Sequence, residues 1–177
     1  MVYILLADGF EEIEALTVVD ILRRSGIDIQ TVGLDKKSIT GSHKITVLCD
    51  IEINDTNKKN IEMLILPGGA GHELLDASNK VHELINYCVS EQIYISSICA
   101  APSILGKKGF LEGKRAVCFP GFEKYLYGAS LDSGKTASDG IFITGKGPGA
   151  SAEFAFEIVK VLKGSEKAEE IKEMMCY

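Results

Sequence analysis

The residue with the clearest chemical potential is Cys99, which follows a predicted buried strand and precedes a predicted helix. Ala100 and Ala101 after it are small, and Pro102 suits the first turn of a helix, where its missing N–H costs nothing. Tight strand-to-helix turns expose a nucleophile, and a helix N-terminus lowers the pKa of a nearby thiol. Most free cysteines are small buried hydrophobes, so position alone leaves a reactive and a structural role equally open.

Two further segments could assist such a thiol. Gly68 and Gly69 follow another apolar run, and glycines there let backbone N–H groups approach a ligand closely. Pro-Gly-Gly also forms ordinary turns, but beside a cysteine it predicts an oxyanion hole made by the N–H groups of Gly69 and Ala100. Glu14 lies one turn into the first predicted helix, among apolar residues. A buried carboxyl group there would be neutral or well paired, and it could donate to a thiolate or transfer a proton.

Other polar residues receive structural roles. Glu11 and Glu12 open the first predicted helix and are expected to complement its dipole. His72 and His82 are expected to lie on solvated helix faces, and His43 receives no role from its spacing. The segment 145–149 has the glycine content of a phosphate loop but lacks its Gly-Lys-Ser/Thr ending, so no nucleotide site is predicted.

The cysteine pattern predicts neither a disulfide framework nor a structural metal. The five cysteines are an odd number at wide spacings, and no Cys-x-x-Cys pair or zinc-ligand histidine spacing is present. No metal and no cofactor is therefore expected. Burial should raise the pKa of Cys49 and Cys118, which lie in predicted strands, and of Cys88, which lies on the core stripe of a predicted helix. Cys176 lies near the end of the chain.

Composition narrows the class of protein. A chain of 177 residues fits one domain, residues 1–177, and a net charge of −6 argues against nucleic-acid binding, which needs a basic face. No apolar run approaches the ~20 residues that span a bilayer, so no membrane contact is expected. No signal peptide is visible, and a cytoplasmic location is predicted.

Strands and helices alternate along the chain, which predicts an α/β fold with a mostly parallel sheet covered by helices on both faces. Helical spacing of apolar residues predicts helices around residues 15–22, 81–89 and 155–162. A helix is also predicted to begin at Pro102, and a last, charged helix at residues 165–175. Strands are predicted at 2–7, 27–34, 46–49, 63–66, 93–98 and 115–118, with a hairpin at 136–144. Ligands bind such sheets beyond the carboxyl ends of strands, where the strand order reverses. That rule selects residues 8–14, 68–71 and 99–102.

The motifs around these segments resemble the ThiJ/PfpI superfamily, and within it the subgroup of the Parkinsonism-associated protein deglycase and its bacterial relatives. The resemblance implies a flavodoxin-like three-layer sandwich, a single glutamine-amidotransferase-like domain and a homodimer. It implies Cys99 as the nucleophile, with a protonated Glu14 against it. The motifs follow the order of the family across nearly the whole chain: Glu11-Glu12-Ile13-Glu14, Leu66-Pro67-Gly68-Gly69, Ile98-Cys99-Ala100-Ala101-Pro102, and Gly145-Lys146-Gly147-Pro148-Gly149 followed by Glu153-Phe154-Ala155.

The resemblance also implies a cofactor-free activity on a small carbonyl substrate. This is conversion of methylglyoxal or glyoxal to the hydroxy acid, or protein deglycation, with a role in oxidative stress. A redox sensor or holdase chaperone without physiological enzyme activity is the alternative, and an intracellular peptidase is a third. The family often has a histidine before a proline after the elbow helix, where this chain has Phe119 before Pro120. The peptidase reading, which needs a base, therefore loses support, whereas a mechanism with Glu14 as proton shuttle remains.

Overall fold

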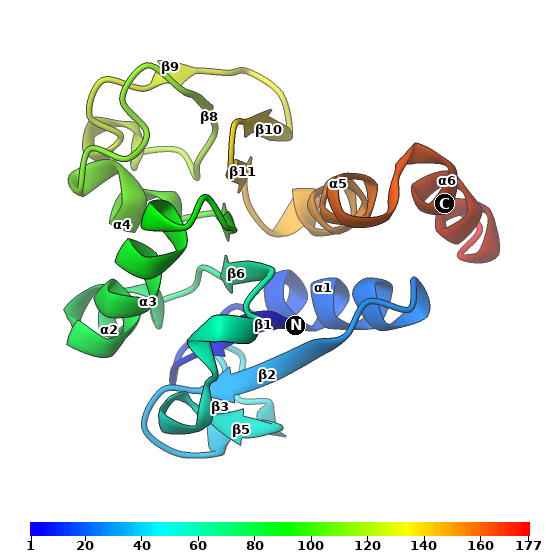
Figure 1. The fold of residues 1–177 in the computed structure, drawn as a ribbon, viewed down its shortest axis with the longest axis horizontal. Helices are drawn as coiled ribbons and strands as arrows, with labels where there is room; N and C mark the ends of the chain where they lie inside the picture. The colour runs from blue at the N-terminus through cyan, green and yellow to red at the C-terminus, as the bar shows by residue number, and fades with distance from the viewer.

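A seven-stranded sheet forms the centre of the structure, a computed structural model that describes residues 1–177 (Figure 1). Its strands are β1 (Val2–Leu6), β2 (Ile29–Gly33), β5 (Ile51–Glu52), β6 (Met63–Leu66), β7 (Tyr94–Ile98), β10 (Thr136–Asp139) and β11 (Phe142–Gly145). They lie in the order β10-β11-β7-β6-β1-β2-β5, and every pair is parallel except β10 with β11. The predicted mostly parallel sheet and the antiparallel hairpin near its end are confirmed.

Helices cover both faces of this sheet, as Figure 1 shows. One face carries α1 (Glu12–Arg24), α5 (Ser151–Lys163) and α6 (Ser165–Met174), and the other carries α2 (His72–Ala77), α3 (Asn79–Ser90) and α4 (Pro102–Lys107). Side chains of β1 alternate between the two layers, because successive residues of a strand point to opposite faces. Ile4 joins the core cluster under α1 and α5, and Leu5 joins the one under α3. The three-layer flavodoxin-like sandwich is confirmed.

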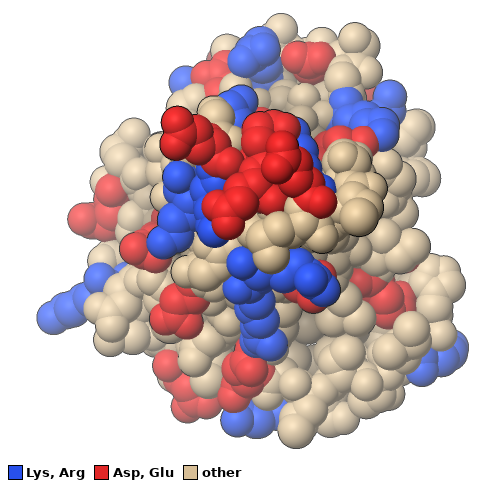
Figure 2. All heavy atoms as spheres, turned by 90° about the vertical axis from the view of Figure 1, so that its right-hand side faces the viewer, with Lys and Arg blue, Asp and Glu red and all other residues tan.

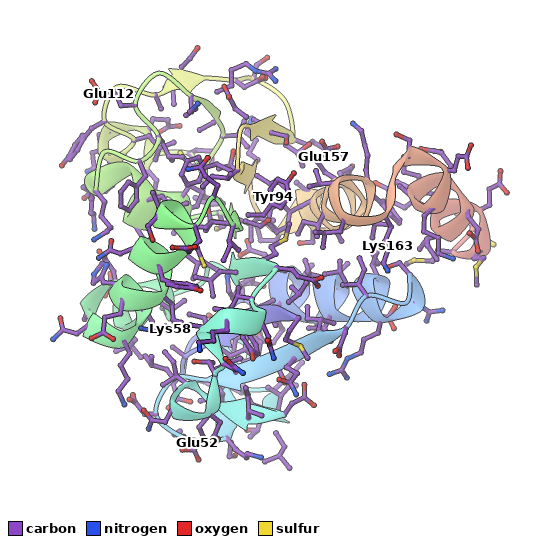
Figure 3. The ribbon with its side chains drawn as sticks, viewed as in Figure 1. Glu52, Lys58, Tyr94, Glu112, Glu157 and Lys163 are labelled. Carbon is purple, nitrogen blue, oxygen red and sulfur yellow. The ribbon has the colours of Figure 1, made fainter.

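The first helix illustrates how the sequence pattern produces an element. Its inward face repeats at helical spacing through Val18 and Ile21, and both are fully buried. Two arginines in its last turn complement the helix dipole, and Gly26 follows with φ +71°, a conformation that glycine adopts readily. Side chains from the sheet also pack against the core cluster under α1 and α5. Tyr94 lies beside α5 (Figure 3) and packs against the core cluster on that face.

Two predicted strands lie outside the central sheet. Residues 46–49 form β4 (Thr46–Leu48), which pairs with β3 (Ser38–Thr40) in a separate hairpin. Residues 115–118 form β8 (Arg115–Ala116), which pairs with β9 (Ser130–Leu131). Both pairs carry several exposed side chains, so they lack the two buried faces of a central strand. Three short elements, α2, β5 and β9, were not predicted, because so few residues show no periodicity.

The chain leaves β1 toward β2 on one side and later occupies β6 and β7 on the other, so the strand order reverses beside β1. The carboxyl ends of β1, β6 and β7 therefore meet at one edge of the sheet, where a ligand site was predicted from the sequence. On the face that carries α6, acidic side chains gather and lysines and arginines lie among them (Figure 2). No helix of the structure has the length and apolar character needed to cross a membrane.

Candidate active site

Cys99 stands on a strained turn directly after β7. Its φ of +65° lies in the left-handed region, which a residue with a side chain occupies at a cost of ~1–3 kcal/mol. The surrounding backbone holds it there: the Cys99 N–H donates to the carbonyl of Gly145 at 2.9 Å, and its own carbonyl accepts from the N–H of Phe119 at 2.8 Å. The residue is buried, with 8% of its surface exposed. The predicted elbow is therefore present, with the sulfur near but not open to solvent.

Glu14 reaches this sulfur from the inward face of α1, where its side chain is fully buried. Its Oε2 accepts the N–H of Gly68 at 2.8 Å, and its Oε1 is buried without a hydrogen-bond partner. The carboxyl group lies beside the Cys99 thiol, which favours its charged form. Gly68 makes the approach possible. A Cβ on this glycine would lie 2.6 Å from both Glu14 Oε2 and Cys99 Cβ, so any side chain would push the two groups apart.

The two predicted N–H donors also converge on Cys99. The backbone N–H groups of Gly69 and Ala100 act to lower the pKa of the Cys99 thiol, because both favour the thiolate. Gly69 has φ +78°, and a Cβ on it would lie 2.5 Å from the N of Glu11 and from the carbonyl of Gly9. Only glycine fits this crossing. The arrangement joins the three segments that were predicted to meet at the edge of the sheet.

Burial raises the pKa of Glu14 to about 7, even though the Cys99 thiol and the Gly68 N–H favour its charged form. The carboxyl group is thus protonated below neutral pH, as the resemblance implies, and ionised above it. Burial and the charge of Glu14 also raise the pKa of Cys99 to about 12, against the effect of Gly69 and Ala100. The expectation that the elbow lowers the thiol pKa is wrong while Glu14 is ionised, because desolvation and that charge oppose the thiolate.

Burial raises the pKa of the other enclosed cysteines as predicted, to about 11 for Cys49 and Cys118 and about 12 for Cys88. The pKa therefore does not distinguish Cys99 from Cys88. The distinction lies in the contacts: burial alone raises the pKa of Cys88, whereas Cys99 has two N–H donors and a carboxyl group that can exchange a proton with it.

Comparisons with known proteins identify the family of the chain. A family model described as "DJ-1/PfpI family" matches residues 1–161. The chain belongs to the DJ-1/PfpI family. Protein dj-1beta of Drosophila melanogaster is 33% identical over 172 residues, which cover 95% of this chain and 92% of that protein. Its crystal structure covers 99% of this chain and 96% of the solved chain at 32% identity, with a TM-score of 0.94.

Two further relatives of the DJ-1/PfpI chain carry names of activities. A deglycase of Pyrococcus abyssi is 31% identical over 164 residues, which cover 92% of this chain and 99% of that protein. A glutathione-independent glyoxalase of Caenorhabditis elegans is 30% identical over 168 residues, which cover 94% of this chain and 90% of that protein. The family relationship spans nearly the full length of each protein.

Glu12 has a larger role than the helix-dipole effect predicted for it. It is buried, and its Oε1 accepts the backbone N–H of His43 at 2.8 Å, while His43 Nδ1 lies 2.9 Å from Oε2. Although burial acts to raise it, the hydrogen bonds with His43 and Ile45 lower the pKa of Glu12. With Glu11, these side chains bring possible metal ligands within 4.8 Å of one another. The hydrogen bonds explain this cluster as a brace between α1 and the β3–β4 hairpin.

His72 and His82 are not the solvated residues that the sequence suggested. His72 is buried, and its Nδ1 donates to the carbonyl of Gly69 at 2.8 Å. His82 is half-buried, and its Nε2 donates to the carbonyl of Asp76 at 2.7 Å. Helical spacing predicted that His72 and His82 lie outside the core, because spacing within one helix does not show which residues are covered by other segments of the chain. No histidine ring bonds to Cys99 or Glu14, so this member of the DJ-1/PfpI family has no Cys–His dyad.

Proposed function

We propose that this chain is a cofactor-free cysteine enzyme that converts small α-oxoaldehydes, such as methylglyoxal and glyoxal, to α-hydroxy acids. The observation that carries the proposal is the buried contact between the Cys99 thiol and Glu14, whose pKa is raised to about 7 by burial. A carboxyl group with a pKa near neutrality can both accept and return a proton in one turnover. Relatives named deglycase and glyoxalase support the same chemistry.

In the first step the Cys99 sulfur adds to the aldehyde carbon, and Glu14 takes the thiol proton. The N–H groups of Gly69 and Ala100 hold the new oxyanion, which then receives that proton from Glu14 to form a hemithioacetal. Glu14 next moves a proton from the former aldehyde carbon to the ketone carbon, and the hydroxyl proton of the hemithioacetal passes to the former ketone oxygen, which leaves a thioester. Water hydrolyses the thioester and frees the hydroxy acid and the thiol. One carbon is oxidised as its neighbour is reduced, so no external redox partner is needed.

Production of lactate from methylglyoxal by the purified protein tests the proposal. Cys99→Ala should abolish turnover, and Glu14→Gln should lower kcat/KM by about a hundredfold or more, as expected for a lost general base. Cys176→Ala is the matched control, since that cysteine is exposed and distant in sequence from the elbow, and it should retain full activity. An equal rate in Cys99→Ala would refute the enzyme proposal and favour the redox-sensor alternative.

Protein deglycation uses the same first step, because a glycated side chain also presents a carbonyl carbon to Cys99. The peptidase alternative is disfavoured by the structure, since the three histidine rings bond to Glu12 and to the carbonyls of Gly69 and Asp76. Cleavage of peptide substrates that depends on Cys99 would nevertheless revive it. Measuring lactate formation and peptide cleavage on the same preparation separates the two activities.

We also propose a homodimer, which the family resemblance implies. The structure offers an apolar surface for it: Ile13 on α1 and Ile45 and Leu48 on the β3–β4 hairpin are exposed. Glu12 joins the two elements through its contacts with His43 and Ile45. Sedimentation equilibrium at micromolar concentration should give a dimer mass, and Leu48→Glu should shift the protein toward monomer. A monomer mass for the unmodified chain would contradict the proposal.

A further inference from the structure

A cavity of about 280 Å³ lies beside the elbow and has no role in the chemistry described above. It opens between the segment after β8 and the loop that joins β11 to α5. Its lining is mostly carbon, from an aromatic ring, two prolines and the backbone of a glycine-rich loop. The lining residues are Phe119, Pro120, Lys135 and residues 146–150.

Both walls of this cavity are attached to the backbone of Cys99. Phe119 on one wall donates its N–H to the Cys99 carbonyl at 2.8 Å, and Gly145, which precedes the other wall, accepts the Cys99 N–H at 2.9 Å. The cavity therefore adjoins the residue that carries the nucleophile. Cys99 itself is not among the lining residues, so the substituent of a carbonyl compound bound at Cys99 would have to extend past the elbow to enter this space.

Phe119 determines the chemical character of the space. It is 42% exposed, so part of its ring is open to contact with a ligand. Its ring lies against Gly147, where a Cβ would be 3.0 Å from the ring edge, so a side chain at that position would displace the ring. Lys135 contributes its stem to the wall while its ammonium group is paired with Glu153.

We propose that this cavity is a subsite for the substituent of the α-oxoaldehyde, that it prefers an aryl or bulky alkyl group, and that Phe119 determines this specificity. The inference rests on the proposed function and names its substrate class. An enclosed apolar cavity of ~150 Å³ is enough to bind benzene, and this more open space has a volume of about 280 Å³. Stacking of a phenyl ring on Phe119 favours phenylglyoxal over methylglyoxal and glyoxal.

The test compares kcat/KM for phenylglyoxal, followed as mandelate, with kcat/KM for glyoxal. The ratio of the two values removes effects that both substrates share in the chemical steps. We expect a ratio of at least about ten in the unmodified protein, as is usual when an apolar pocket selects a larger group. Phe119→Ala should lower the ratio about three- to tenfold, the loss expected for an aromatic contact. Phe119→Tyr should preserve it.

Tyr127→Ala is the matched control, because Tyr127 is an exposed aromatic residue outside the cavity lining. It should leave the ratio unchanged. Circular dichroism confirms that each variant is folded, and the Cys99→Ala variant corrects for reaction of phenylglyoxal with arginines. Turnover without a preference for phenylglyoxal, or a ratio that Phe119→Ala does not change, would overturn the inference while leaving the proposed function intact.

A binding measurement separates the two proposals if no α-oxoaldehyde is turned over, an outcome that refutes the proposed function. Mandelate and lactate are then compared for their ability to slow alkylation of Cys99 by iodoacetamide. Protection by mandelate at a concentration at least threefold below that of lactate, lost in Phe119→Ala, would support the subsite. Equal protection by the two acids would overturn it.

Discussion

Replacing Glu14 by glutamine should make the folded protein more stable above neutral pH and leave its stability nearly unchanged in acid. The reason is that Glu14 is fully buried, and burial raises its pKa to about 7 from an ordinary value of 4.5. A glutamine keeps an oxygen that can accept the Gly68 N–H and adds an N–H beside the Cys99 sulfur. It removes only the charge that the buried site disfavours.

The sign and size follow from proton linkage. Between pH 4.5 and about pH 7 the folded state retains the Glu14 proton that the unfolded state has lost. The free energy of unfolding of the unmodified protein therefore falls as the pH rises through this range. A shift from 4.5 to about 7 corresponds to about 3 kcal/mol, at ~1.4 kcal/mol for each pH unit. Glu14→Gln should gain this amount relative to the unmodified protein by about pH 8.

Urea unfolding of both proteins, at equal concentration and with a reductant present, measures the difference at several values between about pH 4 and pH 8.5. Thermal unfolding should show a gain of about 6–12 °C for the variant at the high end, since ~1 kcal/mol shifts the melting temperature of a domain of this size by ~2–4 °C. Near pH 4 the two curves should almost coincide.

Glu12→Gln is the matched control, because Glu12 is also a buried acid on α1 but hydrogen bonds lower its pKa. Its charge is stabilised in the folded state, so this variant should lose stability above pH 4.5 and recover toward the unmodified protein in acid. A difference between Glu14→Gln and the unmodified protein that does not change with pH would refute the reasoning, because it would show that Glu14 does not titrate differently on folding.

Further predictions concern reactivity. Glu14→Gln should speed alkylation of Cys99 by iodoacetamide at about pH 8 several-fold, because the charge that raises the thiol pKa is gone; slower alkylation would contradict this. The kcat/KM of the unmodified protein should fall below about pH 7, where Glu14 holds its proton. Mild peroxide should oxidise Cys99 first, largely to the sulfinic acid, and Glu14→Gln should change the rate or the endpoint of this oxidation. Peptide-mapping mass spectrometry measures which cysteine is oxidised. Oxidation of Cys176 or Cys118 while Cys99 stays reduced would count against the elbow argument. Replacing His43, His72 or His82 singly by glutamine should leave kcat/KM within about tenfold of the unmodified value. A larger loss would place that histidine in the site.

Local patterns in the sequence were sufficient for the framework of the fold. Continuous apolar runs such as residues 63–66 require burial on both faces, and helical spacing such as that of residues 81–89 requires one buried stripe. Their alternation predicts the parallel sheet, and the sheet in turn places the turn after each strand at one edge. Cys99 and Glu14 could therefore be assigned to one site before their contact was seen.

The pairing of short strands could not be predicted in this way. Residues 46–48 and 115–116 have strand-forming side chains, but each pairs outside the central sheet. Partner choice depends on which edges remain open once the long strands have packed, and the local sequence does not contain that information. The brace from Glu12 to His43 has the same origin, since 31 residues separate its partners.

The longer strands and helices, and the thiol that stands at the elbow, could be read from neighbouring residues in the sequence. The protonation of the site depends instead on tertiary packing. The pKa of Glu14 and that of Cys99 are both raised because distant segments exclude water from them and place them together. The contact of Phe119 with Gly147 likewise depends on tertiary packing, since two loops far apart in the sequence line the same cavity.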